Sequence, residues 1–174
     1  NPAFTTTGGV RFISANVHPR IVRMNLDLDI LPSLAESWDI SEDGLIYTFY
    51  LDEQAVWEDG VPITAHDVAY TWSEIIPEYH IQASALTANW KEVRAEDDHT
   101  LVLEFEKPRP TFMLFAHDLG ILPKHIYEGT DILENPNNLK PLSGGPYTFK
   151  EYFRGDHIVL ERNENYWIED LPYL

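Results

Sequence analysis

Histidine and carboxylate side chains offer the widest range of chemistry in this chain, so their spacing is the first test for catalysis or metal binding. The histidines are scattered along the sequence, at His18, His66, His80, His99, His117, His125 and His157. None of them belongs to an H-E-x-x-H helix or to a Cys/His array, which are the specific signals of a zinc site. The spacing therefore predicts no metal site.

Adjacent carboxylates occur at Glu58-Asp59 and at Asp97-Asp98, each beside a turn signal. Neighbouring side chains in a strand or turn point apart, so spacing alone does not make either pair a general acid and base. The alternative of glycoside hydrolysis needs two carboxylates about 5–9.5 Å apart across a cleft, which a sequence does not define. The chain also has no nucleophile elbow, P-loop or dinucleotide-binding motif. We therefore predict no catalytic residue, no cofactor and no enzymatic activity.

The composition is that of a globular domain rather than a disordered segment. The 174 residues are 44% hydrophobic and 13% aromatic, which is enough for one sizeable core. A net charge of −17 favours solubility and repels nucleic acid and anionic membranes, so we expect no nucleic-acid partner. No apolar stretch approaches the roughly 20 residues of a membrane span, so this segment is not expected to insert into a membrane.

Two further features concern the compartment. The chain has no cysteine, which excludes disulfides and thiolate metal sites and is compatible with an exported protein. It begins at Asn1 rather than at Met, and it contains no signal peptide. We interpret it as a processed or excised chain from which any targeting signal has been removed.

The best-defined elements that could position functional side chains lie between Leu34 and Trp72. Strict alternation over residues 45–51 predicts a strand. Gly44 and Gly60 supply the conformational freedom of two turns, with a second, short strand between them.

A helix is expected directly after these turns. Thr64 followed by Asp67 predicts a capped helix start, and apolar residues at positions 68, 72, 75 and 76 share one face of that helix. Pro77 predicts its end.

The rest of the chain mixes the two kinds of element. We expect strands over 90–95 and 100–106 and a hairpin of strands 147–153 and 157–162. Short helical turns are expected over 111–116 and 123–129, and loops over 1–9 and 131–143. The pattern indicates an α+β (mixed α/β) fold.

The residues between 34 and 72 resemble the signature of the family 5 extracellular solute-binding proteins, the peptide- and nickel-binding receptors of ABC importers. The matching residues are Leu34-Ala35-Glu36-Ser37-Trp38, Ser41, Asp43-Gly44, Tyr47-Thr48-Phe49, Leu51, Val56-Trp57, Asp59-Gly60, Pro62, Thr64-Ala65 and Asp67-Val68. The resemblance continues over most of the chain, through Ile121-Leu122-Pro123-Lys124-His125, Gly145-Pro146-Tyr147-Thr148-Phe149, Ile158-Val159-Leu160-Glu161-Arg162-Asn163 and Tyr166-Trp167. One departure is Leu142-Ser143-Gly144, where the family usually has V-G-T.

The resemblance implies part of lobe one of a type II periplasmic-binding-protein fold with an additional β-rich subdomain. Residues 1–34 and 141–174 would form the lobe-one core, and residues 35–140 the extra subdomain and the return segment. The first strand of lobe one and the whole second lobe would be absent from this chain.

The same resemblance implies a transport function. The intact protein would capture an oligopeptide, dipeptide or similar small solute outside the membrane by closure of two lobes, and would deliver it to the membrane permease of an ABC importer. Its place would be extracytoplasmic, in the periplasm or at the cell surface, either free or lipid-anchored. The alternative is a stand-alone interaction or adhesion domain without a ligand cleft, and the neighbouring coding sequence would discriminate between the two.

The resemblance also suggests ligand-binding residues. The loop that follows the family's L-[DN]-P element would face the cleft, which maps onto Thr5, Thr6, Thr7 and Gly8. The same Thr/Gly cluster is equally typical of an ordinary polar turn. The segment after the capped helix adds Tyr79 and His80, and His117 precedes the Ile121–His125 match.

Overall fold

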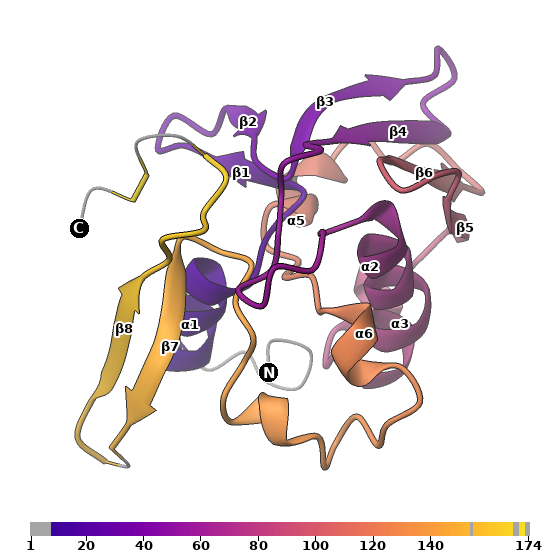
Figure 1. Cartoon of the computed structure of the whole chain (residues 1–174). Helices are drawn as coiled ribbons and strands as arrows, with labels where there is room; N and C mark the ends of the chain where they lie inside the picture. Colours follow the sequence, from indigo (N-terminus) through magenta and orange to yellow (C-terminus); the bar gives the residue numbers. More distant parts are fainter. Residues whose placement is uncertain (1–7, 154, 169–170, 173–174) are drawn as a thin grey trace.

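The computed structural model describes residues 8–153, 155–168 and 171–172, which form a mixture of short helices and antiparallel sheets (Figure 1). The helices are α1 Gly8–Val17, α2 Ala65–Tyr70, α3 Ile76–Tyr79, α4 Ala83–Leu86, α5 Met113–Ala116 and α6 Lys124–Tyr127, with a π-helical turn at Thr71–Ile75 and a 3₁₀ turn at Pro136–Asn138. The strands are β1 Val22–Met24, β2 Ile30–Pro32, β3 Ala35–Ile40, β4 Ile46–Leu51, β5 Trp90–Ala95, β6 Thr100–Phe105, β7 Tyr147–Tyr152 and β8 Ile158–Arg162. None of the helices in these residues is long and apolar enough to cross a membrane.

The largest sheet has the strand order β3-β4-β6-β5, with β4 at its centre. Phe49 of β4 lies opposite Trp38 of β3 and Leu101 of β6. Tyr47 and Phe49 are buried while Ile46 and Tyr50 are exposed, so the predicted alternation of β4 is confirmed. Strand β3 was not predicted, because its charged and polar residues carry little apolar alternation, as is common for an edge strand.

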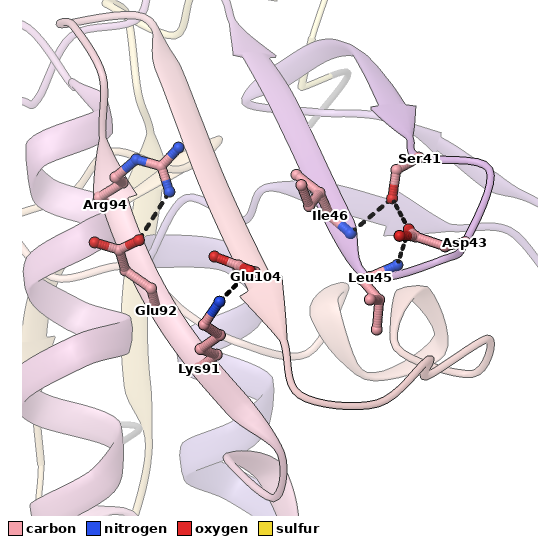
Figure 2. A network of polar contacts seen from close by, with 8 residues as sticks. All are labelled: Ser41, Asp43, Leu45, Ile46, Lys91, Glu92, Arg94 and Glu104. Atoms are coloured by element: carbon pink, nitrogen blue, oxygen red, sulfur yellow. Dashed lines mark hydrogen bonds and ion pairs between the residues drawn. The ribbon is translucent and has the colours of Figure 1, made fainter.

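Polar side chains stabilise this sheet at the β3–β4 turn and between β5 and β6 (Figure 2). Ser41 Oγ donates to Asp43 Oδ1 at 2.6 Å, and the same carboxylate oxygen accepts from the Leu45 N–H at 3.0 Å. These bonds close the β3–β4 turn, in which Gly44 has φ 70°, as predicted. On the other edge, Lys91 Nζ lies 2.6 Å from Glu104 Oε1 and ties β5 to β6.

The helical segment after Thr64 differs from the prediction at its end. Helix α2, the π-helical turn and α3 run on continuously, so the expectation that Pro77 ends the helix is wrong. The N–H of Ile76 bonds to the Thr71 carbonyl, five residues back, which closes the π-helical turn. Pro77, which has no N–H to donate, follows directly after this turn, at the start of α3. The apolar face carrying Val68 and Trp72 is fully buried, as predicted.

The segments before β3 contain more regular structure than the sequence indicates. Helix α1 begins at Gly8, so the prediction of a loop over residues 1–9 is wrong for Gly8 and Gly9. Residues 1–7 lie outside the described part of the chain. The first N–H groups of a helix have no intrahelical partner, so a glycine is tolerated there. The β1–β2 hairpin was not predicted, and it turns through Leu28 with φ 67°.

Between β4 and the turn at Gly60, the further short strand expected from the sequence is not formed in the described residues. Only an isolated bridge between Val56 and Pro62 remains there. The tight turn itself is confirmed, because the Gly60 N–H donates to the Trp57 carbonyl at 2.8 Å.

A large core lies between α2 and the sheet formed by β3, β4, β6 and β5. The Trp72 ring packs edge-on against Phe49 and Phe112, with centroid distances of 6.1 and 5.8 Å. Trp57 and Trp72 are completely buried. These tryptophans therefore serve packing.

The β7–β8 hairpin is joined to α1 through Ser143-Gly144-Gly145. The Gly144 N–H donates to the Val17 carbonyl at 3.0 Å, and Ser143 Oγ lies 3.0 Å from the same oxygen. A Cβ on Gly145 would lie 2.5 Å from the Asn16 carbonyl oxygen. Gly145 thus allows the chain to approach the end of α1 closely, which sets the position of the hairpin beside that helix, whereas a Cβ on Gly144 would meet the side chains of Trp57 and Ile63.

Candidate functional site

The segment from residue 117 to 122 faces the end of α3 and brings Asp118 close to His80. Both side chains line a small cavity of about 20 Å³, whose wall is completed by Thr71, Ile76, Leu119, Gly120 and Leu122. The Thr71 hydroxyl accepts from the Leu122 N–H at 3.0 Å and donates to the Asp67 carbonyl at 2.8 Å. A buried hydroxyl in the π-helical turn therefore fixes the segment against the helix.

His80 is the residue at which α3 ends. Its backbone is extended, with φ −74° and ψ 132°, so the chain turns away from the helix axis. The Gln82 N–H donates to His80 Nδ1 at 3.1 Å. Because Nδ1 accepts this bond, the neutral imidazole carries its hydrogen on Nε2. The His80 ring is thereby held in one tautomer.

Arg20 holds the other end of the segment. Arg20 and Gly120 form an antiparallel bridge, and Arg20 Nη1 donates to the His117 carbonyl at 2.9 Å. Arg20 Nη2 lies 3.5 Å from Asp118 Oδ1, and the Asp118 side chain is 36% exposed. The negative charge of Asp118 is therefore partly balanced while its carboxylate remains within reach of a solute.

The predicted ligand-binding residues do not all meet at this cavity. Thr5, Thr6 and Thr7 lie outside the described residues, and Gly8 is the first residue of α1. His80 lines this cavity, whereas Tyr79 and His117 do not.

Tyr79 and His117 have different surroundings. Tyr79 packs against a second apolar cluster that includes Tyr70 and Tyr127. Partial burial and the nearby Glu78 raise the pKa of Tyr79, so its hydroxyl stays protonated at neutral pH. His117 lines a larger cavity of about 310 Å³, together with His18 and Arg20.

Sequence reasoning missed Arg20 and Asp118, the two charged residues of the site. They lie far apart in the sequence, and their pairing depends on the bridge between Arg20 and Gly120. The only local signal was the position of Asp118 directly after His117. His18 was also missed as a cavity residue. Burial lowers its pKa to about 3, and the positive charge of Arg20 acts in the same direction.

The arrangement offers groups for holding a polar solute. The polar groups of this wall are the His80 imidazole and the Asp118 carboxylate, each of which already has a partner within the described structure. Among the residues that the structure describes, no three His, Cys, Asp or Glu side chains are close enough to hold a metal ion. A cavity of 20 Å³ holds a water molecule at most, so it is one part of a binding wall rather than a complete pocket.

The sequence of this chain is similar to those of known binding proteins. Residues 29–174 match the family profile described as bacterial extracellular solute-binding proteins, family 5 middle. The periplasmic oligopeptide-binding protein OppA of Escherichia coli is 31% identical over 176 residues, covering 89% of this chain and 32% of that protein. The chain spans about a third of the length of the curated relatives that it matches.

Solved structures show the same fold. The oligopeptide-binding protein AppA of Bacillus subtilis, in complex with a nonapeptide, superposes with a TM-score of 0.87 at 27% identity, covering 95% of this chain and 34% of that one. NikZ of Campylobacter jejuni, in complex with Ni(L-His), gives a TM-score of 0.86 at 28% identity, covering 97% and 34%. The predicted fold class, part of the binding-protein fold with mixed helices and sheets, is thereby confirmed.

Proposed function

Because the chain belongs to the bacterial extracellular solute-binding proteins of family 5, we propose that it forms part of the solute-binding component of an ABC importer. The intact protein captures an oligopeptide, a dipeptide or a similar small solute outside the membrane. It is a binding protein and carries out no catalysis.

The observation that carries this proposal is the likeness to a peptide-bound structure over nearly the whole chain. The structure of AppA in complex with a nonapeptide covers 95% of this chain with a TM-score of 0.87. The named relatives are binding proteins: OppA and AppA bind oligopeptides, and DppE of Bacillus subtilis binds dipeptides. A peptide is therefore the best-supported class of solute.

The geometry around His80 fits one wall of such a site. Its imidazole and the Asp118 carboxylate are polar groups of that wall. Pockets for small molecules usually have volumes of roughly 300–1,000 Å³, far above that of the cavity between His80 and Asp118. The remaining walls would come from a second lobe that closes over the solute.

Three finer features belong to the same proposal. Residues 1–34 and 141–174 form the lobe-one core, and residues 35–140 form the extra subdomain and the return segment. The protein works outside the cytoplasm, in the periplasm or at the cell surface, free or lipid-anchored. Its macromolecular partner is the membrane permease of the importer.

Isothermal titration of the intact protein with peptides of defined length and with Ni²⁺ tests the function. We expect saturable binding of at least one peptide class, and unchanged peptide after long incubation. Absence of binding to every peptide and to Ni²⁺ would count against a role as a solute receptor. Cleavage of the peptide would show that the protein is an enzyme.

A further inference from the structure

A larger cavity, which is lined in part by Arg20, lies where α1 ends. It is enclosed by the end of α1, the β1–β2 hairpin, the start of β7 and the segment that follows β8, all on the same side of the molecule in Figure 1. Its volume of about 310 Å³ is at the lower end of the range for small-molecule sites. The cavity is therefore large enough for a small organic molecule.

The charge of its wall differs from that of the whole chain. The sequence has 29 acidic and 12 basic residues, yet the described residues that line this cavity include Arg20 and Arg23 and no Asp or Glu. The carboxylate near the wall is that of Asp118, which pairs with Arg20 at 3.5 Å. No ion pair is found between Arg23 and the described carboxylates. The cavity is thus a local site of positive charge on an acidic protein, and it favours an anion.

Buried polar atoms around the cavity need hydrogen-bond partners. His18 Nδ1, His117 Nδ1 and Trp167 Nε1 are each buried and have no partner among the described residues. Leaving such an atom unsatisfied costs roughly 1–3 kcal/mol. His18 is only 4% exposed, and its low pKa keeps the ring neutral. A polar ligand, or water molecules held with it, would satisfy these atoms.

Aromatic rings form the flat part of the wall. Tyr166 and Trp167 both line the cavity, and their ring centroids are 4.6 Å apart. Burial raises the pKa of Tyr166 to about 12, although the charge of Arg23 acts in the opposite direction. The phenol therefore stays protonated at neutral pH and can donate a hydrogen bond. Together the wall offers cations, neutral donors and aromatic surface.

We propose that this cavity binds a small organic carboxylate. The carboxylate group lies against Arg23 and Arg20, and the apolar body of the ligand lies against Tyr166 and Trp167. The site is distinct from the His80–Asp118 cavity and does not depend on which solute the protein carries.

Benzoate and benzamide are matched probes, because they have the same shape and differ in charge. Isothermal titration and tryptophan fluorescence of the intact protein should show saturable binding of benzoate and much weaker binding of benzamide. Arg23→Met removes the exposed cation of the wall and should weaken benzoate binding at least about tenfold, the effect of one lost charge-assisted bond. Lys107→Met removes the same charge from an exposed position after β6 and should leave the affinity unchanged.

A variant that narrows the cavity without changing its charge distinguishes binding inside the cavity from a general effect of charge. Ala15 lies on α1 at the cavity wall, and Ala15→Leu keeps the helix while it narrows the cavity. It should weaken benzoate binding without changing the thermal unfolding midpoint by more than a few degrees. The proposal is overturned if benzoate does not bind, if benzamide binds equally well, or if Arg23→Met and Lys107→Met have the same effect.

Discussion

The carboxylate of Asp67 accepts a hydrogen bond of 2.8 Å from the backbone N–H of Lys124, which lies 57 residues further along the chain. Its other oxygen accepts from the Thr64 N–H at 2.8 Å. One buried side chain thus satisfies backbone donors at the starts of two helices, α2 and α6. Lys124 follows shortly after the segment 117–122 that carries Asp118, so the contact ties the chain beyond this segment to the start of α2.

Replacing this carboxylate should destabilise the protein. Asp67→Ala leaves two backbone N–H groups without their acceptor, and we expect a loss of roughly 2–3 kcal/mol in the free energy of unfolding. Urea unfolding followed by far-UV circular dichroism measures the change. Glu53→Ala removes an acid from an exposed position and should change stability by less than about 0.5 kcal/mol. Equal stability of the two variants would show that the contact contributes little.

Gly145 should tolerate no side chain. Its added Cβ, which is fixed to the Gly145 backbone, would approach the Asn16 carbonyl oxygen to 2.5 Å, and this oxygen also belongs to the backbone and does not move easily. We expect Gly145→Ala to lower stability by roughly 1–3 kcal/mol. In Gly155→Ala the added Cβ meets no neighbouring atom, so only the strain of φ 81° remains, about 1 kcal/mol. A Gly145→Ala protein as stable as the wild type would contradict the close approach to α1.

His18 should make stability depend on pH. Its pKa is about 3 in the folded protein against an ordinary value of 6.5, so the unfolded chain binds a proton in this window that the folded protein does not. The free energy of unfolding is therefore unaffected by the titration of His18 above pH 6.5. As the pH falls from 6.5 towards 3, it decreases by about 1.4 kcal/mol per pH unit. At about pH 5 the loss amounts to roughly 2 kcal/mol.

The matched variant for this prediction is His18→Asn, which cannot acquire the proton. Carboxylates that titrate in the same window act on both proteins, so the difference between their stability curves isolates His18. Urea unfolding from neutral to mildly acidic pH should show a steeper loss for the wild type. Parallel curves would mean that the folded protein accepts the proton on His18.

The elements that were predicted correctly are those with strong local signals. Strand β4 alternates between buried and exposed residues, and α2 begins at the Thr64 cap, so both follow from neighbouring residues alone. Strand β3 was missed because its polar and charged residues carry little apolar alternation, and the β1–β2 hairpin because each of its strands has only three residues. Pro77 was misinterpreted because the π-helical turn before it cannot be seen in the sequence.

The candidate site was less predictable than the fold. His80 could be proposed from the resemblance to the family, and the structure places it beside Asp118. The contact of Arg20 with Asp118 depends on pairing between residues 20 and 120, which has no local signature. Charge pairs of this kind are properties of the tertiary fold.

Whether the wall formed by His80 and Asp118 contacts the solute is tested most directly by changing these two residues and measuring solute binding by the intact protein. With the peptide that binds the wild type, His80→Ala and Asp118→Ala should each raise the dissociation constant at least about tenfold, since each removes a polar group of the proposed wall. His99→Ala and Asp27→Ala change the same residue types outside this cavity and should leave the constant unchanged. Unchanged binding in both wall variants would contradict the account.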